Sequence, residues 1–191
     1  MNRDERHPFR RFGGRNMRWA PAVLVWILVG CWPYANIDIR VELPDSALEE
    51  AFDRLELGLR GRRSPRPAPK GVTVDTPEIE ALQEARKERL QALSALLEAG
   101  IAGQSRDVRL VLRSEGPESL SPKELENARG LLDRENMDRE ALVAEIMRAN
   151  SVKGTGNLKS VREVYTIVLR RRAGLNWWVQ WPDGGWSRKD R

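Results

Sequence analysis

A short apolar run, Ala20–Cys31, follows an N-terminal segment that carries six arginines but only one aspartate and one glutamate. A basic segment, a short apolar stretch and a small residue at its end are the three parts of a secretory signal peptide. A membrane-spanning helix would need about 20 consecutive apolar residues, whereas Pro33 and the polar residues from Asn36 onward end this run early. We therefore expect residues 1–30 to be removed, which leaves residues 31–191 to build the fold.

The end of the apolar run also carries a lipidation signal. Its last four residues, Leu28, Val29, Gly30 and Cys31, resemble the lipobox of bacterial lipoproteins. The resemblance implies that Cys31 becomes the first residue and carries acyl chains such as palmitate, which hold the protein on a membrane. In lipoproteins of this kind, an aspartate directly after the cysteine retains the protein in the inner membrane. This chain has Trp32 at that position, so the resemblance implies a periplasm-facing protein of the outer membrane. A buried thiol and a soluble core helix are the alternatives, and the arginines upstream disfavour the helix.

The composition of the expected mature chain excludes several functions. Removing six arginines and two acidic residues from the 33 basic and 28 acidic residues of the chain leaves a net charge near +1. A nucleic-acid partner attracted by overall basicity is therefore not expected. His7 is lost with the signal and Cys31 is used as the anchor. This excludes Ser-His and Cys-His nucleophile systems and the usual zinc ligand sets, so we expect no catalytic residue, no metal and no cofactor.

The remaining charged residues are expected on solvated faces or at helix caps. Carboxylates two residues apart on a helix do not share a face, so they do not form an acid–base pair. A carboxylate-based hydrolase is therefore disfavoured. The residues concerned are Asp133 with Glu135, Asp138 with Glu140, and the alternating charges Glu84, Arg86, Lys87, Glu88 and Arg89.

The first part of the mature chain predicts a strand, a helix and a linker. Apolar residues alternate with polar ones over Asn36–Leu43, which is typical of a half-buried strand. Ser46 and Glu49 predict a capping box for a helix that ends near Leu59. Residues 60–74 contain three alternating prolines and several basic residues, which favour an extended linker. A basic patch on anionic headgroups is the alternative interpretation of this segment.

Three further helices are predicted after the linker. The first begins at Thr76-Pro77 and ends at Gly100, and the second begins at the capping box of Ser121. Its apolar stripe loses register near Asn136, which predicts a kink or a break capped by Asn136 or Asp138. The third helix is expected to follow Asn157 and to end in an arginine triplet. Residues 107–113 predict a short strand between the first two of these helices.

The C-terminal end predicts a β-hairpin rich in tryptophan. Asp183-Gly184 is a strong turn signal, and a two-residue turn there sets Trp181 opposite Trp186. We then expect Trp177, Trp181 and Trp186 to pack on the helix of residues 161–168, with Trp178 on the other face beside Gln180 and Lys189. The alternative leaves the tryptophans exposed as an interface, for which the candidate residues are Trp177, Trp178, Trp181 and Trp186.

Together these elements predict a fold that is mainly α with minor β: a small helical domain with an N-terminal strand and a C-terminal hairpin. The expected organisation is a signal peptide (1–30), a lipidated N-terminus with a strand and a helix (31–59), a linker rich in proline and arginine (60–74), and a helical domain ending in the hairpin (75–191).

Several stretches resemble the YdbL-like family, a group of bacterial envelope proteins that is catalogued as a domain of unknown function. They are Ile37–Ala51, Glu135–Leu142 with Ala149-Asn150, Trp178–Gln180, Asp183–Trp186 and Arg188-Lys189. The resemblance implies an envelope location and an association with large AsmA-like proteins thought to carry phospholipid. It implies no catalytic residues.

Two functions follow as hypotheses. The first is a non-catalytic accessory lipoprotein that docks an unidentified envelope protein. The second is a module that binds lipid or a membrane surface through the tryptophan hairpin and the basic C-terminus, since residues 159–191 carry eight basic and three acidic residues.

Overall fold

The computed structural model describes residues 43–62, 69–113, 118, 120–152 and 155–190, all within one compact unit. The predicted fold class, mainly α with minor β, is confirmed. The elements are α2 (Asp45–Leu59), α3 (Pro77–Glu98), β1 (Ala102–Gln104), β2 (Leu110–Leu112), α4 (Pro122–Ala149), α5 (Thr155–Arg172), β3 (Trp178–Gln180) and β4 (Trp186–Arg188).

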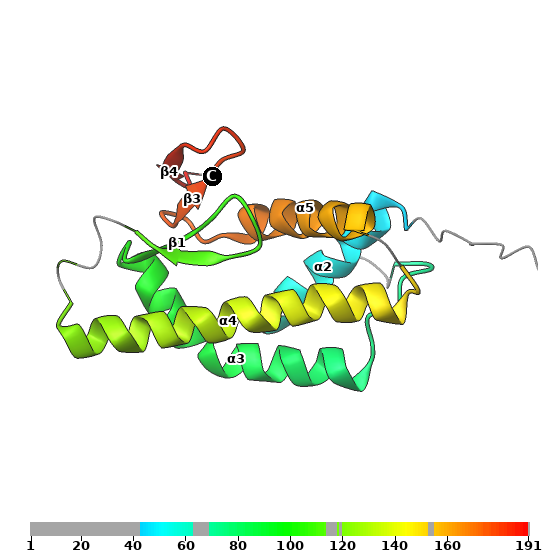
Figure 1. Ribbon diagram of the computed structural model, residues 1–191, viewed down its shortest axis with the longest axis horizontal. Coiled ribbons are helices and arrows are strands. Elements are labelled where there is room, and N and C mark those ends of the chain that lie inside the picture. Colours follow the sequence, from blue (N-terminus) through cyan, green and yellow to red (C-terminus); the bar gives the residue numbers. More distant parts are fainter. Residues whose placement is uncertain (1–42, 63–68, 114–117, 119, 153–154, 191) are drawn as a thin grey trace, which may run out of the picture. The chain divides into compact units, whose positions relative to one another are not determined.

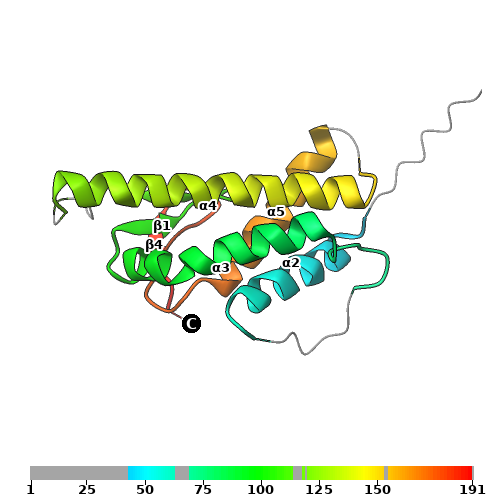
Figure 2. The same ribbon diagram turned by 90° about the horizontal axis from the view of Figure 1, so that it is seen from below.

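The helices pack in two pairs, α2 with α5 and α3 with α4 (Figures 1 and 2). The sheet has the strand order β2-β1-β3-β4. Two antiparallel hairpins are joined by a parallel ladder in which Gly103 of β1 pairs with Trp178 of β3. Helix α4 contacts β2 and α3 contacts β1, so one face of the sheet, here called the inner face, lies on the helices.

Two hydrophobic clusters form the core. The larger one lies between α2, α3, α4 and α5, and includes Phe52 stacked on Tyr165 with ring centroids 4.2 Å apart. The second lies between α3, α4 and the sheet and includes Leu93, Leu97, Ala102, Leu110 and Leu132, with Trp177 packed against it.

Local capping signals were correct for α3 and α4 and wrong for α2. Thr76 accepts the N–H of Ile79, and Ser121 with Glu124 forms the predicted capping box. The predicted box of Ser46 and Glu49 is not formed, because α2 begins earlier: Pro44 is its N-cap, and the Pro44 carbonyl accepts the N–H of Leu48.

The predicted break near Asn136 is also wrong, because α4 is one continuous helix. The apolar stripe loses register there because Glu135 and Arg139, both buried, occupy the core-facing positions. Similarly, Asn157 does not cap α5, which begins at Thr155.

The predictions for the first part of the chain fall largely outside the described residues. These include the signal peptide, the lipobox with Cys31, the strand expected over Asn36–Leu43 apart from its last residue, and residues 63–68 of the linker. The end of the linker segment packs on the core: Val72 and Val74 are buried. Thr73 between them is hydrogen bonded to the side chain of Asn150 in both directions, at 2.7 and 3.0 Å.

The hairpin forms, but its register differs from the prediction by one residue. Gln180, not Trp181, lies opposite Trp186. The loop has three residues instead of two: Gly184 donates to the Trp181 carbonyl, and Trp181 donates to the carbonyl of Gly185. Gly184 has a φ of +90°, as expected for a type I turn followed by a bulge. Pro182, which favours the first central position of such a turn, is the physical reason.

Lys189 ties the hairpin to the end of α5. Its Nζ atom donates to three carbonyl groups of that helix end, at 3.1 Å to Arg170, at 3.0 Å to Ala173, and to Arg171. Lys189 therefore lies beside Trp177. The predicted register had placed it beside Trp178. A cation at this position compensates the free carbonyl groups of a helix end.

Candidate functional site

Helices α2, α3 and α4 bring four charged side chains together in the interior. They are Glu56, Arg86, Glu135 and Arg139. Glu135 and Arg139 are four residues apart and share one face of α4. Arg86 and Glu135 are each only 2% exposed, so the sequence-based expectation of solvated charges is wrong for both.

Close contacts join these groups into one network. Nη2 of Arg86 lies 2.9 Å from Oε1 of Glu56 and 3.0 Å from Oε1 of Glu135. Nε of Arg139 lies 2.7 Å from the same Glu135 oxygen, and its Nη1 donates to the side chain of Gln104 at 2.7 Å and to the carbonyl of Val108 at 3.0 Å. The network therefore joins three helices to the loop between β1 and β2.

The environment fixes the charge states of the network. Burial raises the pKa of Glu135, but the guanidinium groups of Arg139 and Arg86 outweigh this and hold the pKa below its ordinary value of 4.5. Burial raises the pKa of Tyr165 well above 10.0, against the charge of Arg86. The phenol therefore keeps its proton and donates a hydrogen bond to Oε1 of Glu56 at 2.7 Å.

A second ion cluster joins α2 to the end of α5. Asp53 accepts from Nη2 of Arg171 at 2.9 Å and from Nε and Nη2 of Arg172 at 2.6 and 2.5 Å. Arg171 also pairs with Glu49. Burial raises the pKa of Asp53, but the hydrogen bonds from Arg172 and Arg171 outweigh this and keep it below 3.8. The arginines that end α5 thus form ion pairs with α2, in addition to their favourable interaction with the dipole of their own helix.

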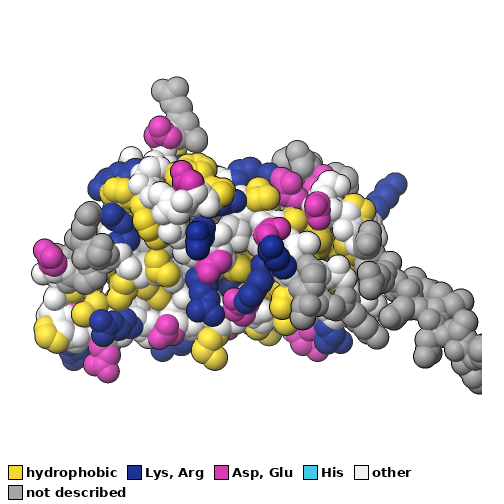
Figure 3. Space-filling model, turned by 45° about the horizontal axis from the view of Figure 1, so that its top comes forward, with side chains coloured by type: hydrophobic (Ala, Val, Ile, Leu, Met, Phe, Trp, Pro, Cys, Tyr) yellow, Lys and Arg dark blue, Asp and Glu magenta, His cyan; other side chains and the backbone are white. Residues whose placement is uncertain are grey.

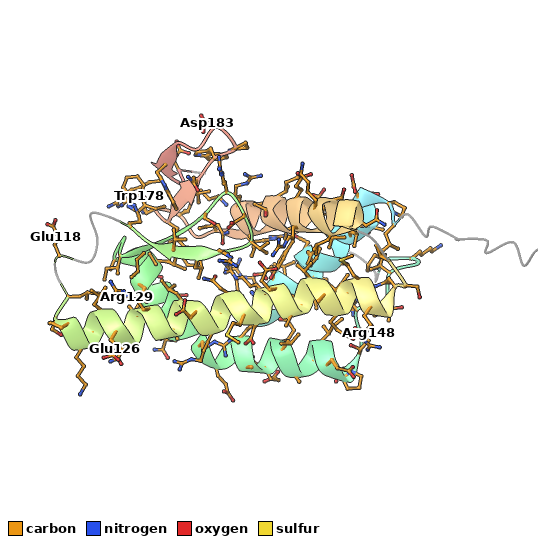
Figure 4. The ribbon with its side chains drawn as sticks, viewed as in Figure 1. Glu118, Glu126, Arg129, Arg148, Trp178 and Asp183 are labelled. Carbon is orange, nitrogen blue, oxygen red and sulfur yellow. The ribbon has the colours of Figure 1, made fainter. Side chains whose placement is uncertain are left out.

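The outer face of the sheet, opposite α3 and α4, carries Trp178, Gln180, Trp186 and Arg188, because paired residues share a face. Two guanidinium groups lie over the ring of Trp178: Cζ of Arg113 is 3.5 Å from its ring centroid and Cζ of Arg188 is 5.4 Å away. Figure 4 shows Trp178 on the sheet and Asp183 at the hairpin tip. The surface in Figure 3 mixes hydrophobic, basic and acidic side chains.

The four candidate tryptophans lie in different environments. Trp178 and Trp186 share the outer face, and Trp186 covers Gly103 so closely that a Cβ atom there would lie 2.6 Å from the indole. Trp177 packs on the second core cluster and under the guanidinium of Arg60. Trp181 is 43% exposed and donates its Nε1–H to Ser187. The predicted packing of three tryptophans on residues 161–168 is therefore wrong.

Two kinds of feature are absent from the described residues: a membrane-spanning helix and a metal site. Among them, no helix is long and apolar enough to cross a membrane, and no group of histidine, cysteine and carboxylate side chains suited to a metal ion is found. No family model, curated protein or solved structure matches the chain.

The buried network was missed, although the sequence carries a signal for it. Glu135 and Arg139 fall between Leu132 and Leu142 on the apolar stripe of α4. Charged residues on such a stripe, at a spacing that lets them pair, are better explained by a buried ion pair than by a break in the helix.

Proposed function

We propose that the chain is a non-catalytic, lipid-anchored periplasmic lipoprotein of the bacterial envelope that docks another envelope protein through the outer face of its sheet. The observation that carries this proposal is Trp178, stacked against Arg113 and near Arg188 on that face. Tryptophan and arginine are the residues most enriched among those that dominate binding energy at protein interfaces. The lipobox resemblance supplies the proposed anchor at Cys31 and the outer-membrane location.

The non-catalytic part of the proposal rests on how the buried polar groups are used. Glu56, Glu135 and Tyr165 are each committed to partners inside the protein. A general base or nucleophile must instead reach a substrate in a cleft. The network therefore supports a structural role, in which it holds α2, α3 and α4 together and ties them to Gln104 of β1 and to Val108 in the loop that follows.

The proposed partner is a protein, and the YdbL-like resemblance points to an AsmA-like phospholipid-transport protein. Photo-crosslinking in cells tests this, with a photoreactive residue at Arg188 on the outer face and a control at exposed Lys123 in the first turn of α4. We expect one discrete protein adduct at position 188, lost when Trp178→Ala is added, and none at position 123. Adducts of equal yield at both positions, or adducts that persist with Trp178→Ala, would contradict the docking face.

The alternative, a module that binds a membrane surface, is favoured by the exposed ring of Trp181 beside the basic C-terminus. Crosslinks from position 188 to lipid alone, with a blue shift of tryptophan fluorescence on anionic vesicles, would support it and oppose the protein partner.

The anchor is tested separately with Cys31→Ser. We expect this variant to remain unlipidated, with its signal uncut or the protein misplaced. Recovery of the variant as processed protein in the membrane fraction would overturn the proposed anchor while leaving the docking face untouched.

A further inference from the structure

The two edges of the sheet differ in how they are covered. At the β2 edge, the side chain of Asn136 is hydrogen bonded to both backbone polar groups of Leu110. The other edge is β4 (Figure 1), and no further strand of the described chain pairs with it. An open edge strand is a template for pairing with another chain, and proteins usually block such edges. The β4 edge is therefore a candidate binding site.

The backbone of β4 presents unused polar groups along this edge. Lys189 donates to the carbonyl of Trp177 across the hairpin. Hydrogen-bonded pairs alternate with non-bonded pairs in an antiparallel ladder, so the register turns the N–H and C=O groups of Trp186 and Arg188 away from β3. None of these groups has a hydrogen-bond partner within the described residues.

The side chains of β4 leave these backbone groups uncovered. The strand contains no proline. The guanidinium of Arg188 lies back over the sheet, with its Cζ 5.4 Å from the ring centroid of Trp178 on β3. The indole of Trp186 also lies back over the sheet, against Gly103 of β1. A chain that approaches from the side of β4 therefore meets its backbone directly.

The charges beside this edge favour an acidic partner. The outer face carries Arg188 in β4 and has Arg113 over Trp178, whereas the strand residues on that face include no carboxylate. Arg188 makes no ion pair within the described residues. Like charges brought together across an interface are unfavourable, so charge complementarity disfavours a second copy of this chain and favours a segment that supplies carboxylates.

On the opposite side of β4, an exposed indole flanks the edge. Ser187 accepts the Nε1–H of Trp181 at 2.7 Å, so this ring lies beside β4 on the side to which Ser187 points. The ring belongs to one of the exposed large hydrophobic residues. Since residues that pair across two strands share a face, the residue of an added strand that pairs with Ser187 would contact Trp181. An apolar side chain fits this position.

We propose that an extended segment of the docking protein adds to the β4 edge as a fifth strand. Its backbone binds the outward N–H and C=O groups of Trp186 and Arg188, an apolar side chain lies opposite Ser187, and carboxylates lie beside Arg188 on the outer face. In this kind of recognition, backbone hydrogen bonds supply affinity and alternate side chains supply specificity. The inference rests on the proposed docking function and names the chemistry of the segment that docks.

Photo-crosslinking in cells from position 190 tests whether the partner follows the edge. Asp190 is exposed just past β4, which leaves Arg188 free to be varied. Arg188→Pro removes an outward N–H that β3 does not use, and proline is tolerated at such edge positions. The matched control Arg188→Gln keeps the N–H and loses only the charge. We expect a protein adduct with the wild-type edge, and a yield about tenfold lower in Arg188→Pro than in Arg188→Gln.

The outcomes separate this inference from the docking face itself. Equal yields in Arg188→Pro and Arg188→Gln would show that the partner does not pair with the backbone, and would overturn the added strand while leaving the docking face intact. An adduct from position 188 with none from position 190 would do the same. Loss of adducts from both positions would contradict the docking face. Adducts with lipid or with a second copy of this chain would overturn the acidic segment.

Two further measurements do not depend on proline. Arg188→Glu reverses the charge and keeps the N–H, so we expect it to give a lower yield than Arg188→Gln. An equal or higher yield would overturn the proposed carboxylates. Mass spectrometry of the adduct identifies the crosslinked segment of the partner, in which we expect carboxylate and apolar side chains at alternating positions. A segment without this alternation would overturn the proposed strand.

Discussion

The side-chain amide of Asn136 in α4 is hydrogen bonded to both backbone polar groups of Leu110 in β2. Its Oδ1 accepts the Leu110 N–H at 2.8 Å, and its Nδ2 donates to the Leu110 carbonyl at 2.9 Å. Because β2 is an edge strand of the sheet, Asn136 takes the place that the next strand would occupy. Edge strands left open invite pairing with other chains, so this amide protects the edge and fixes α4 to the sheet.

Asn136→Ala should lower the free energy of unfolding by about 1–3 kcal/mol, because two partly buried backbone groups lose their partner. Urea denaturation measures the change. The matched control is Met137→Ala at the next position, where the side chain is 71% exposed and a change within about 0.5 kcal/mol is expected. Equal effects of the two substitutions would show that the amide bridge contributes little.

Glu135→Gln should be more damaging, by about 3–5 kcal/mol, because it leaves Arg86 and Arg139 without their shared buried counter-charge. The control is Asp133→Asn on the exposed side of the same helix. Denaturation midpoints near wild type for both variants would mean that water enters and screens the network.

Stability should also decrease in acid through Asp53. The pKa of Asp53 is lower in the folded protein than its ordinary value of 3.8, so the unfolded state binds this proton more readily. The contribution of Asp53 is therefore complete above 3.8 and is lost as the pH falls through the lowered folded-state pKa. Asp53→Asn should flatten this part of the curve of unfolding free energy against pH, whereas Asp75→Asn at an exposed position should not. A curve for Asp53→Asn parallel to that of wild type would contradict the assignment.

Gly103→Ala should cost about 1–3 kcal/mol, because the added methyl group overlaps the indole of Trp186. The displaced indole should also become more accessible to an aqueous fluorescence quencher. Gly130→Ala in α4 is the control, because a Cβ atom there meets nothing within 4 Å. Alanine is more favourable than glycine inside a helix by about 1 kcal/mol, so this variant should be slightly more stable than wild type. Loss of stability in both variants would argue against a specific clash.

The elements that could be predicted from the sequence depend on local chemistry. Thr76-Pro77 and the Ser121–Glu124 box mark their helix starts through neighbouring residues alone. The predicted hairpin register was wrong because Pro182 favours a loop of three residues instead of two. The prediction considered only the Asp-Gly pair. Local sequence signals thus predict the presence of a helix or hairpin more reliably than the register in which its strands pair.

The candidate sites also differ in whether their residues are close together in the sequence. The tryptophan cluster is visible in the sequence because its members are close together. Glu135 pairs with Arg139 four residues along α4 and with Arg86 and Arg89 of α3. Nothing near Glu135 in the sequence identifies Arg86 as its counter-ion. The pair of Arg86 and Glu135 exists only once α3 and α4 are packed together, so single-sequence patterns favoured solvated charges instead.

The parallel ladder between β1 and β3 also sets the order in which the protein can be completed. The two strands lie far apart in the chain, with α4 and α5 between them, so a long loop must close before they pair. A chain synthesised from its N-terminus can form the β1–β2 hairpin long before Trp178 is made. Until then, the β1 edge that will receive β3 is without its partner strand. Translation must therefore reach the last residues before the sheet is whole, and truncation ahead of β3 would leave that edge exposed to other nascent chains.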